Sequence, residues 1–375
     1  MSVQELLDTA VEGDAIPGLV AITATPEGVG EITAAGLPDD TIFRYASMTK
    51  LITTVAVMQL VERGELALEQ EVASVLPEFA DLQVLDSFEG NEPVLRAPAS
   101  AATVGQLLNH TAGCSYFFSN ERLHRYNEIT GGPHILTGLR ASVTAPLIAD
   151  PGTIWEYGCN TDWAGLLVEE ISGSDLETYL RQNVSDPLGL ESVTFAPSDE
   201  QRDRMMPIHH RQPDGSAAPG ELELPSPPEF WPGGHGLHGT AADYGRFMAA
   251  ILNGGAEILQ PASVDRMFAN TLGDIALPEL IRSADPIFSN DIPSLPVPQG
   301  WGLGVHLTLE DLPGMRRAGT GDWAGLFNSY YWIDRASGVA GAIFTQLLPF
   351  FDERVVEAAI GFEQAVYTEV GAPAG

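Results

Sequence analysis

The sequence has little positive charge and almost no lysine. Its 18 Lys and Arg residues comprise 17 arginines and one lysine, Lys50, whereas 51 acidic residues bring the formal net charge to −33. Lysine is a common residue in globular proteins, so about twenty would be ordinary at this length. So negative a surface repels phosphate backbones and anionic lipid, which argues against nucleic acids and membrane surfaces as partners. Solubility is the simplest interpretation of the charge.

Cysteine and long apolar runs are scarce too. Cys114 and Cys159 give neither a disulfide framework nor metal-ligand spacing, and they favour a reducing, cytoplasmic location. No apolar run approaches the ~20 residues of a membrane span. The first 18 residues lack a signal-peptide pattern and are expected to form an amphipathic helix of the mature protein.

Several common motifs of enzyme sites are also missing. The sequence has no H-E-x-x-H, C-x-x-C, G-x-x-x-x-G-K or G-x-S-x-G pattern. His235 and His238 in GGHGLHG, like the pair His209 and His210, lack further ligands nearby and are expected to be loop or hydrogen-bonding residues. We therefore predict no metal and no cofactor.

Strand patterns occur at both ends of the chain, and helical patterns dominate its middle. The expected strands lie at residues 18–24, 30–35, 41–45, 302–307, 315–320, 327–333 and 339–346. The expected helices lie at residues 51–63, 103–108, 161–172, 241–252, 261–269 and 352–370. The simplest arrangement is one α/β (α+β) unit over residues 1–375, with a sheet from both ends (1–75 and 300–375) flanked by helices and a mainly helical insert (76–299). Long loops, which usually shape a binding site, are expected at 116–133, 211–234 and 272–300.

Ser47 and Lys50 form an S-x-x-K motif at the start of a helix that is apolar on nearly all sides. Residues at i and i+3 share a helix face, so the hydroxyl and the amine can meet. A serine hydroxyl is a weak nucleophile until a base removes its proton, and burial disfavours the charged form of a lysine that would be that base. The helix N-terminus, Ser47 included, offers N–H groups to an oxyanion. The alternative is a capping Ser47 beside a surface-paired Lys50, and the buried helix argues against it.

Two further segments can complete this pair. Tyr157 lies in the turn WEYGCNTD before a helix, where its hydroxyl can act as acid or base with the lysine. Residues 318–325, AGTGDWAG, link two expected strands, and the backbone N–H of Asp322 or Trp323 is a candidate second oxyanion donor. Taken alone, Tyr157 would more simply be a packing residue, but beside S-x-x-K it is expected to be functional. Residues 318–325 are explained equally well as a Gly-rich connection between strands.

With these signals in this order, the chain resembles the serine β-lactamase and penicillin-binding-protein superfamily over nearly its whole length. It is most similar to the class C-like branch of family VIII carboxylesterases and statin-side-chain acyltransferases. The resemblance rests on FRYASMTKLITTVAVMQLVERGEL, QLLNHTAG, WEYGCNTD, HGLHGTAADYGRFMAAIL and LFNSYYWIDRASGVAGAIFTQLLPF. It implies a β-lactamase/transpeptidase-like antiparallel sheet, with an active site between the sheet and the helical insert. Ser47 would be acylated, while Lys50 and Tyr157 would transfer the proton.

The chain departs from the family pattern at two places. The asparagine of a Y-x-N motif would fall on Cys159, and Asn160, one residue later, is a candidate substrate contact. The K-T-G motif aligns with residues 319–321, which makes Gly321 a candidate as well but leaves out the cation that faces a substrate carboxylate in the family. Arg316 or Arg317 can replace that cation, although strand alternation lets only one of them face the cleft.

The sequence therefore predicts a serine carboxylesterase that acts on small to medium neutral esters through an acyl-Ser47 intermediate. An acyltransferase is the second hypothesis, and weak β-lactam or amide hydrolysis is the third. A non-enzymatic acyl-binding sensor is also possible, although a protein that only binds has less need of Lys50. The small-molecule ester is the one partner predicted, and no oligomeric state follows from the sequence. The acyltransferase hypothesis rests on aromatic residues that can form an acceptor pocket: Phe117, Phe118, Phe230 and Trp231.

Overall fold

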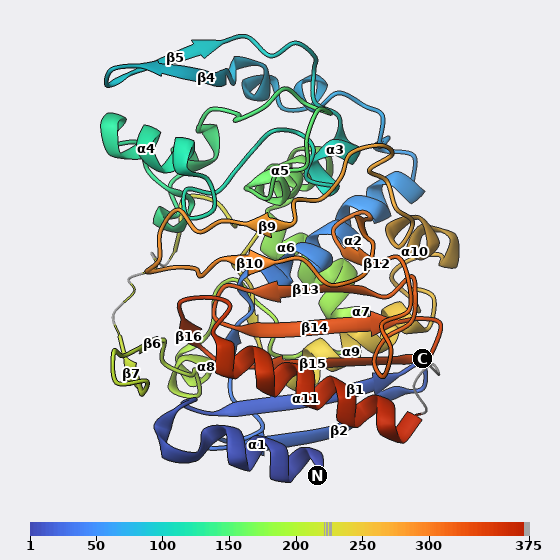
Figure 1. The fold of residues 1–375 in the computed structure, drawn as a ribbon. Helices are drawn as coiled ribbons and strands as arrows, with labels where there is room; N and C mark the ends of the chain where they lie inside the picture. Colours follow the sequence, from blue (N-terminus) through green and yellow to red (C-terminus); the bar gives the residue numbers. More distant parts are fainter. Residues whose placement is uncertain (221, 223, 225–226, 371–375) are drawn as a thin grey trace.

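The computed structural model describes residues 1–220, 222, 224 and 227–370 (Figure 1). Its main sheet has seven antiparallel strands in the order β11-β12-β13-β14-β15-β1-β2. The strands are β1 (Leu19–Thr25), β2 (Gly28–Ala35), β11 (Gln299–Trp301), β12 (His306–Thr308), β13 (Gly321–Gly325), β14 (Ser329–Asp334) and β15 (Val339–Phe344). The start and the end of the chain therefore meet at the β1–β15 pair, as the sequence predicted.

Each face of the sheet buries its own set of side chains. Alternation sends Val20 and Ile22 of β1 into the large core, while Leu19 and Ala21 enter a smaller one. The smaller core lies under α1 (Val3–Val11) and α11 (Glu353–Val370), which lie together in front of the sheet (Figure 1). The opposite face is covered by α9 (Ala241–Leu252), which packs on β1, β2 and β15. Both termini thus help to cover the sheet that they help to form.

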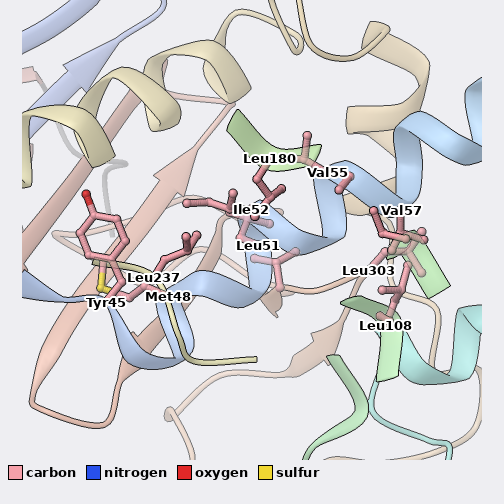
Figure 2. Packing of buried hydrophobic residues seen from close by; sticks show 14 of the residues in the cluster. Tyr45, Met48, Leu51, Ile52, Val55, Val57, Leu108, Leu180, Leu237 and Leu303 are labelled. Carbon is pink, nitrogen blue, oxygen red and sulfur yellow. The ribbon is translucent and has the colours of Figure 1, made fainter. Parts of the chain in front are cut away.

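The helix α2 (Thr49–Glu62) runs through the middle of the helical region and is buried from Thr49 to Leu60. Its apolar side chains point in several directions, and Figure 2 shows them meeting Leu108, Leu180 and Leu303 from three other segments. A helix that is apolar all round belongs in a core, which is what its sequence predicted. The start of α2 is therefore held firmly from all sides.

The remaining elements surround α2 or extend the sheet edges. The helices are α3 (Val104–Leu108), α4 (Glu121–Thr130), α5 (Asn160–Ser172), α6 (Leu176–Leu180), α7 (Asp186–Leu188), α8 (Asp199–Asp203) and α10 (Pro261–Met267). The short strands are β3 (Phe43–Arg44), β4 (Val84–Glu89), β5 (Glu92–Arg96), β6 (His209–Arg211), β7 (Ala217–Pro219), β8 (His238–Gly239), β9 (Leu280–Ile281), β10 (Ile292–Pro293) and β16 (Leu347–Leu348). Nowhere in the described part of the chain is a helix both long and apolar enough to span a membrane.

Three local predictions were wrong. Residues 315–320 form a turn instead of a strand, because backbone N–H groups of Arg317 and Ala318 donate to the carboxylates of Asp334 and Asp311, outside any ladder. The predicted strand 302–307 is mostly the turn between β11 and β12, in which Gly304 has a φ of +74°, and only residues 306 and 307 belong to a strand, β12. The predicted loop 116–133 contains α4, which Asn120 caps. Residues 221, 223, 225 and 226 of the predicted loop 211–234 lie outside the described residues.

Candidate active site

Ser47 follows a strained residue at the start of α2. Ala46 has a φ of +46°, a backbone conformation that costs a non-glycine residue about 1–3 kcal/mol and is concentrated at functional sites. Ala46, Ser47 and Met48 form a single 3₁₀ turn that leads into α2. The backbone of Tyr45 is fixed by its N–H, which donates to the Leu237 carbonyl at 2.9 Å. These restraints place a half-buried Ser47 hydroxyl on the helix N-terminus.

Lys50 has three hydrogen-bond partners, and all three are neutral oxygens. Its Nζ lies 3.1 Å from Ser47 Oγ, 3.0 Å from the Tyr116 hydroxyl and 2.8 Å from the Gly234 carbonyl. Only 1% of Lys50 is exposed. The salt bridges formed by the described residues do not include Lys50. An ammonium has three N–H groups, so this arrangement satisfies all of them without a carboxylate.

Tyr116 is the site residue that sequence reasoning missed. Its hydroxyl contacts Lys50, and its side chain lines the same pocket as Ser47. Burial, with the charge of Asp162 adding to it, raises the pKa of Tyr116 well above its usual value, so this hydroxyl stays a neutral phenol. Its position three residues after the end of QLLNHTAG, at the start of an expected pocket loop, was the available signal. A tyrosine in a loop does not reveal its distance to a lysine 66 residues away.

Tyr157 lies beside Lys50 in a different orientation. Lys50 Nζ is 4.7 Å from the centroid of the Tyr157 ring, which is cation–π geometry, and the Tyr157 hydroxyl accepts a hydrogen bond of 2.9 Å from the indole Nε1 of Trp323. An N–H donor at the phenol oxygen stabilises negative charge there. The structure thus places the Tyr157 ring beside the lysine, but the phenol oxygen that hydrogen-bonds Lys50 Nζ is that of Tyr116.

The end of β13 lies against the nucleophile. A Cβ at Gly325 would stand 2.5 Å from the Tyr45 carbonyl oxygen, so only glycine permits this close approach, and Leu326 lines the pocket of Ser47. Gly321, which the K-T-G alignment placed at the site, is at the other end of β13 against Phe268 and Val305. The alignment was displaced by several residues, because residues 315–320 form a turn and β13 begins only at Gly321.

The pocket that contains Ser47 has a volume of about 140 Å³. Two of the three predicted binding-site loops contribute to it, through Phe118 of 116–133 and Trp231 of 211–234, whereas no residue of 272–300 lines it. Phe117 instead packs on His134 and Phe288, and Phe230 is buried in the core. The further residues of the wall that matter below are Arg44, Arg202, His235, His238 and Phe327. Two of the four aromatic residues predicted for this pocket therefore line it.

The sequence matches the Beta-lactamase family over residues 3–365. The chain belongs to the β-lactamase family. A lovastatin esterase from Penicillium rubens is 33% identical over 349 residues, which make up 89% of this chain and 86% of that protein. A monacolin J acid methylbutanoyltransferase from Aspergillus terreus is 32% identical over 88% of this chain and 83% of that protein. The solved structure of unliganded simvastatin synthase from Aspergillus terreus matches with a TM-score of 0.83 and 29% identity, covering 98% of this chain and 97% of that one.

These similarities establish the β-lactamase/transpeptidase-like fold and the enzyme class that the sequence predicted. The relatives include both an esterase and acyltransferases, and the chain covers most of their length. A serine hydrolase or acyltransferase of the β-lactamase family is therefore the identity that the comparisons support.

Within this family arrangement, the position of the Y-x-N asparagine holds Cys159, which is buried against Cys114. Asn160 does not take over, because its side-chain nitrogen lies 2.9 Å from Nδ1 of His110 and the residue is fully buried away from Ser47. Burial, with the charge of Lys50 adding to it, lowers the pKa of His110 well below its usual value, so this ring is neutral.

The predicted replacement for the missing K-T-G cation is also not at the site. Arg316 is buried beneath α11, where it pairs with both carboxylate oxygens of Glu363 and with Asp322. Asp322 in turn accepts from His306 Nδ1 at 2.9 Å, and burial, which by itself raises the pKa, is outweighed by His306 and Arg316, so the pKa of Asp322 is lowered. Arg317 is exposed on the turn before β13. The Asp322 side chain thus belongs to an ion cluster on the far face of the sheet.

The histidines of GGHGLHG lie on the pocket wall. Burial, with the charge of Arg44 adding to it, lowers the pKa of His238 to about 4. Over residues 1–220, 222, 224 and 227–370, no group of three or more His, Cys, Asp or Glu side chains is placed to hold a metal ion. We therefore consider His235 and His238 as groups of the pocket itself.

Proposed function

We propose that this chain is a serine carboxylesterase that forms an acyl-Ser47 intermediate. The observation that carries the proposal is the contact of 3.1 Å between Ser47 Oγ and a buried Lys50 whose other two partners are also neutral oxygens. A lysine in this setting has no ion pair to lose when it gives up its proton, so it can act as a base. The chain works as one catalytic unit, because the nucleophile lies between the sheet and the helical region.

In the first half of the reaction, neutral Lys50 takes the hydroxyl proton of Ser47 while Oγ forms a bond to the ester carbonyl carbon. Collapse of the tetrahedral intermediate breaks the bond to the alcohol, and the proton passes to the departing oxygen. Tyr157 shares this proton transfer: its ring covers Lys50, and the Trp323 indole stabilises charge on its oxygen. The neutral hydroxyl of Tyr116 holds the amine in place. In the second half of the reaction, water attacks the acyl-enzyme, and the same groups take up its proton.

The oxyanion is held between Ser47 and the end of β13. The first donor is the backbone N–H of Ser47 at the helix N-terminus. β13 pairs with β12 only at Gly321 and Asp322, so its edge beyond them is open toward Ser47. Leu326 is the first residue of the turn after β13. The turn bond from Asn328 N–H to the Gly325 carbonyl directs that carbonyl toward β14, which leaves the amide of Leu326 on the open edge. Leu326 replaces Asp322 and Trp323 as our candidate for the second donor.

Neutral esters with a small acyl group are the proposed substrates. A cavity of about 140 Å³ admits a short acyl chain, and its wall includes Phe118, Trp231 and Phe327. The arginines on the wall already have partners in the protein: Arg44 donates to the Met206 carbonyl at 3.1 Å, and Arg202 is engaged as well. Gly319 stands at the position of the K-T-G cation, and among the described residues neither Arg316 nor Arg317 lines the pocket, which favours β-lactam and peptide hydrolysis as the weaker activity.

Acyl transfer is the second candidate function. Phe118 and Trp231 offer an aromatic wall to an alcohol acceptor beside Ser47, and relatives of this chain are named as acyltransferases. An acceptor bound there would take the place of water in the second half of the reaction.

The test is turnover of p-nitrophenyl butyrate, with intact and peptide mass spectrometry of the quenched enzyme. We expect a 70-Da acyl adduct on the peptide that contains Ser47, and its loss in Ser47→Ala. Nitrocefin and a panel of alcohols run beside the ester separate the alternatives. Turnover that rises severalfold with an alcohol, with its ester as product, favours the transferase; nitrocefin turnover equal to ester turnover, or an adduct on another residue, contradicts the esterase.

A further inference from the structure

The glycine pair of GGHGLHG passes between α2 and α5 and contacts both helices through its backbone. The Gly233 carbonyl accepts a hydrogen bond of 2.7 Å from Thr53 Oγ1, and the Gly234 carbonyl accepts from Lys50 Nζ at 2.8 Å. The Gly234 N–H donates to Asp162 Oδ1 at 3.0 Å. One residue, Gly234, therefore connects the lysine of α2 to a carboxylate of α5.

We propose that Asp162 is a positioning residue for the reaction at Ser47: it fixes the Gly234 carbonyl that holds Lys50. The proposal deepens the proposed function and rests on it. Asp162 does not touch the reacting atoms, and it acts through Gly234.

The contact has no room for adjustment. A Cβ on Gly234 would lie 2.5 Å from Asp162 Oδ2, and a Cβ on Gly233 would lie 2.9 Å from the Thr161 carbonyl oxygen. Both neighbours belong to the first turn of a buried helix, so neither can move away cheaply. Glycine is therefore required at both positions for the backbone to reach Asp162 and Lys50 at the same time. This requirement explains the glycine pair of GGHGLHG, which the sequence alone left without a role.

His235 extends the same connection to the pocket. Its Nδ1 lies 3.4 Å from Asp162 Oδ1, and its side chain lines the cavity that contains Ser47. The carboxylate thus accepts from Gly234 on one side and lies near a pocket histidine on the other, although His235 Nδ1 has no hydrogen-bond partner in the described part of the chain.

The burial of Asp162 supports a role beyond packing. Its side chain has 0% exposure, and in the described part of the chain Oδ2 has no hydrogen-bond partner. A buried carboxylate that is only partly satisfied destabilises the fold, and such groups in native proteins call for a reason. The first turn of α5 favours the negative charge there, which lowers the cost of keeping it. The titratable groups that face Asp162 or Lys50 from the surrounding elements are His110, Tyr116, Tyr157, Cys159 and His235.

The test compares Asp162→Ala and Asp162→Asn with a control, Asp334→Asn, which alters an equally buried carboxylate bonded to Tyr367 and to two backbone N–H groups. Asparagine can still accept from Gly234, so we expect Asp162→Asn to keep the acylation rate within about fivefold, and Asp162→Ala to lower it ~30–100-fold with KM within about twofold. The pH midpoint of acylation in Asp162→Asn moves to lower pH, because the carboxylate no longer favours the protonated forms around it. The control leaves the midpoint unchanged.

The single lysine provides a readout that does not depend on turnover. In protein grown with [¹³Cε]lysine, the side-chain NMR spectrum contains one resonance, that of Lys50. We expect this resonance to shift in Asp162→Ala and to stay in place in Asp334→Asn. A wild-type resonance and a wild-type acylation rate in Asp162→Ala would overturn the proposal. If the alanine variant does not fold, an unchanged pH midpoint in Asp162→Asn overturns it equally.

The two proposals fail in different ways. If wild-type protein never acylates Ser47 but the lysine resonance moves in Asp162→Ala, the esterase is refuted and the positioning of Lys50 stands. If Ser47 is acylated but neither the lysine resonance nor the pH midpoint changes in the Asp162 variants, the esterase stands and the positioning proposal is refuted.

Discussion

Lys50 and Arg316 are both buried cations, and they are held in opposite ways. Lys50 meets a hydroxyl, a phenol and a backbone carbonyl, all of them neutral. Arg316 meets three carboxylate oxygens, two from Glu363 and one from Asp322. Burial alone would lower the pKa of Arg316, but these two carboxylates outweigh it, so the pKa is raised. One cation is thus held by neutral oxygens alone, and the other is held by carboxylates.

This difference separates a catalytic cation from a structural one. A guanidinium stays protonated in proteins and binds carboxylates in a planar fork, whereas an amine can give up its proton when its surroundings do not oppose it. The chain has arginine at its other 17 basic positions and keeps lysine at the one position beside a serine. We interpret the solitary lysine in this way: the site needs a base, and arginine cannot serve as one.

The sharpest way to break the comparison is to exchange the two cation types. Lys50→Arg keeps the charge but removes the base, so we expect kcat/KM for p-nitrophenyl butyrate to fall by ~10³-fold or more, as in Ser47→Ala. Arg316→Lys is the matched control and should keep the activity of the folded enzyme within about threefold. Wild-type rates in Lys50→Arg would show that the proton of Ser47 is removed by another group.

Removing each cation altogether should separate them by stability. Arg316→Met leaves two buried carboxylates without a partner, so we expect it to lower the free energy of unfolding by about 3–5 kcal/mol. Lys50→Met leaves only neutral groups behind and should cost about 1 kcal/mol or less. Urea unfolding measures both. Equal losses of stability in the two variants would contradict the division into catalytic and structural cations.

The two tyrosines around Lys50 can be ranked by removing each hydroxyl. Tyr157→Phe loses the group assigned to proton transfer, for which we expect a ~10²–10³-fold lower kcat. Tyr116→Phe loses a neutral contact to the amine and should lower kcat by about tenfold. Rapid-quench measurement of the acylation step gives both values, and the reverse order would make Tyr116 the proton-transfer group.

His238 extends the comparison to a half-buried titratable group that lies near a cation, Arg44. Burial and then Arg44 lower its pKa to about 4, while the unfolded chain takes up the proton near pH 6.5. Between these two pH values the unfolded state binds more protons, so stability falls with falling pH by about 1.4 kcal/mol per unit, or about 3 kcal/mol in all. We expect urea unfolding of His238→Gln to show a shallower fall over this window, although His110 contributes in the same direction. An unchanged slope would show that His238 is already charged in the folded protein.

The smallest effect concerns Trp323. Trp323→Phe keeps the ring beside Tyr157 but removes the N–H that donates to its hydroxyl, so we expect a loss of about three- to tenfold in kcat at unchanged KM. Trp332→Phe, in the neighbouring strand on the α11 side, is the control for removing an indole from the sheet. A loss in both variants alike would assign the effect to packing.

The sequence was sufficient where local pattern decides the structure. The apolar circumference of 51–63 predicted a buried α2, and i to i+3 spacing predicted the contact between Ser47 and Lys50. The strand 339–346 was found because β15 is apolar throughout and buried on both faces. Each of these features follows from the pattern of a short run of consecutive residues.

The sequence was insufficient where distant segments meet. Arg316 is paired with Glu363, 47 residues away, and no periodicity indicates that contact. Tyr116 reaches Lys50 across 66 residues, through a loop whose path depends on the packing of its neighbours. The strand at 315–320 was predicted wrongly for a similar reason, because the carboxylates of Asp334 and Asp311 hold this segment in a turn and the strand β13 begins only at Gly321.

One measurement tests the central claim most directly: the rate of acylation of Ser47 in wild-type protein and in Lys50→Ala, followed by rapid quenching with p-nitrophenyl butyrate and peptide mass spectrometry. The account predicts an acyl group on the Ser47 peptide of the wild type that forms ~10³-fold more slowly, or not at all, in a folded Lys50→Ala. Acylation of Ser47 at the wild-type rate without Lys50, or acylation of a different residue, would contradict it.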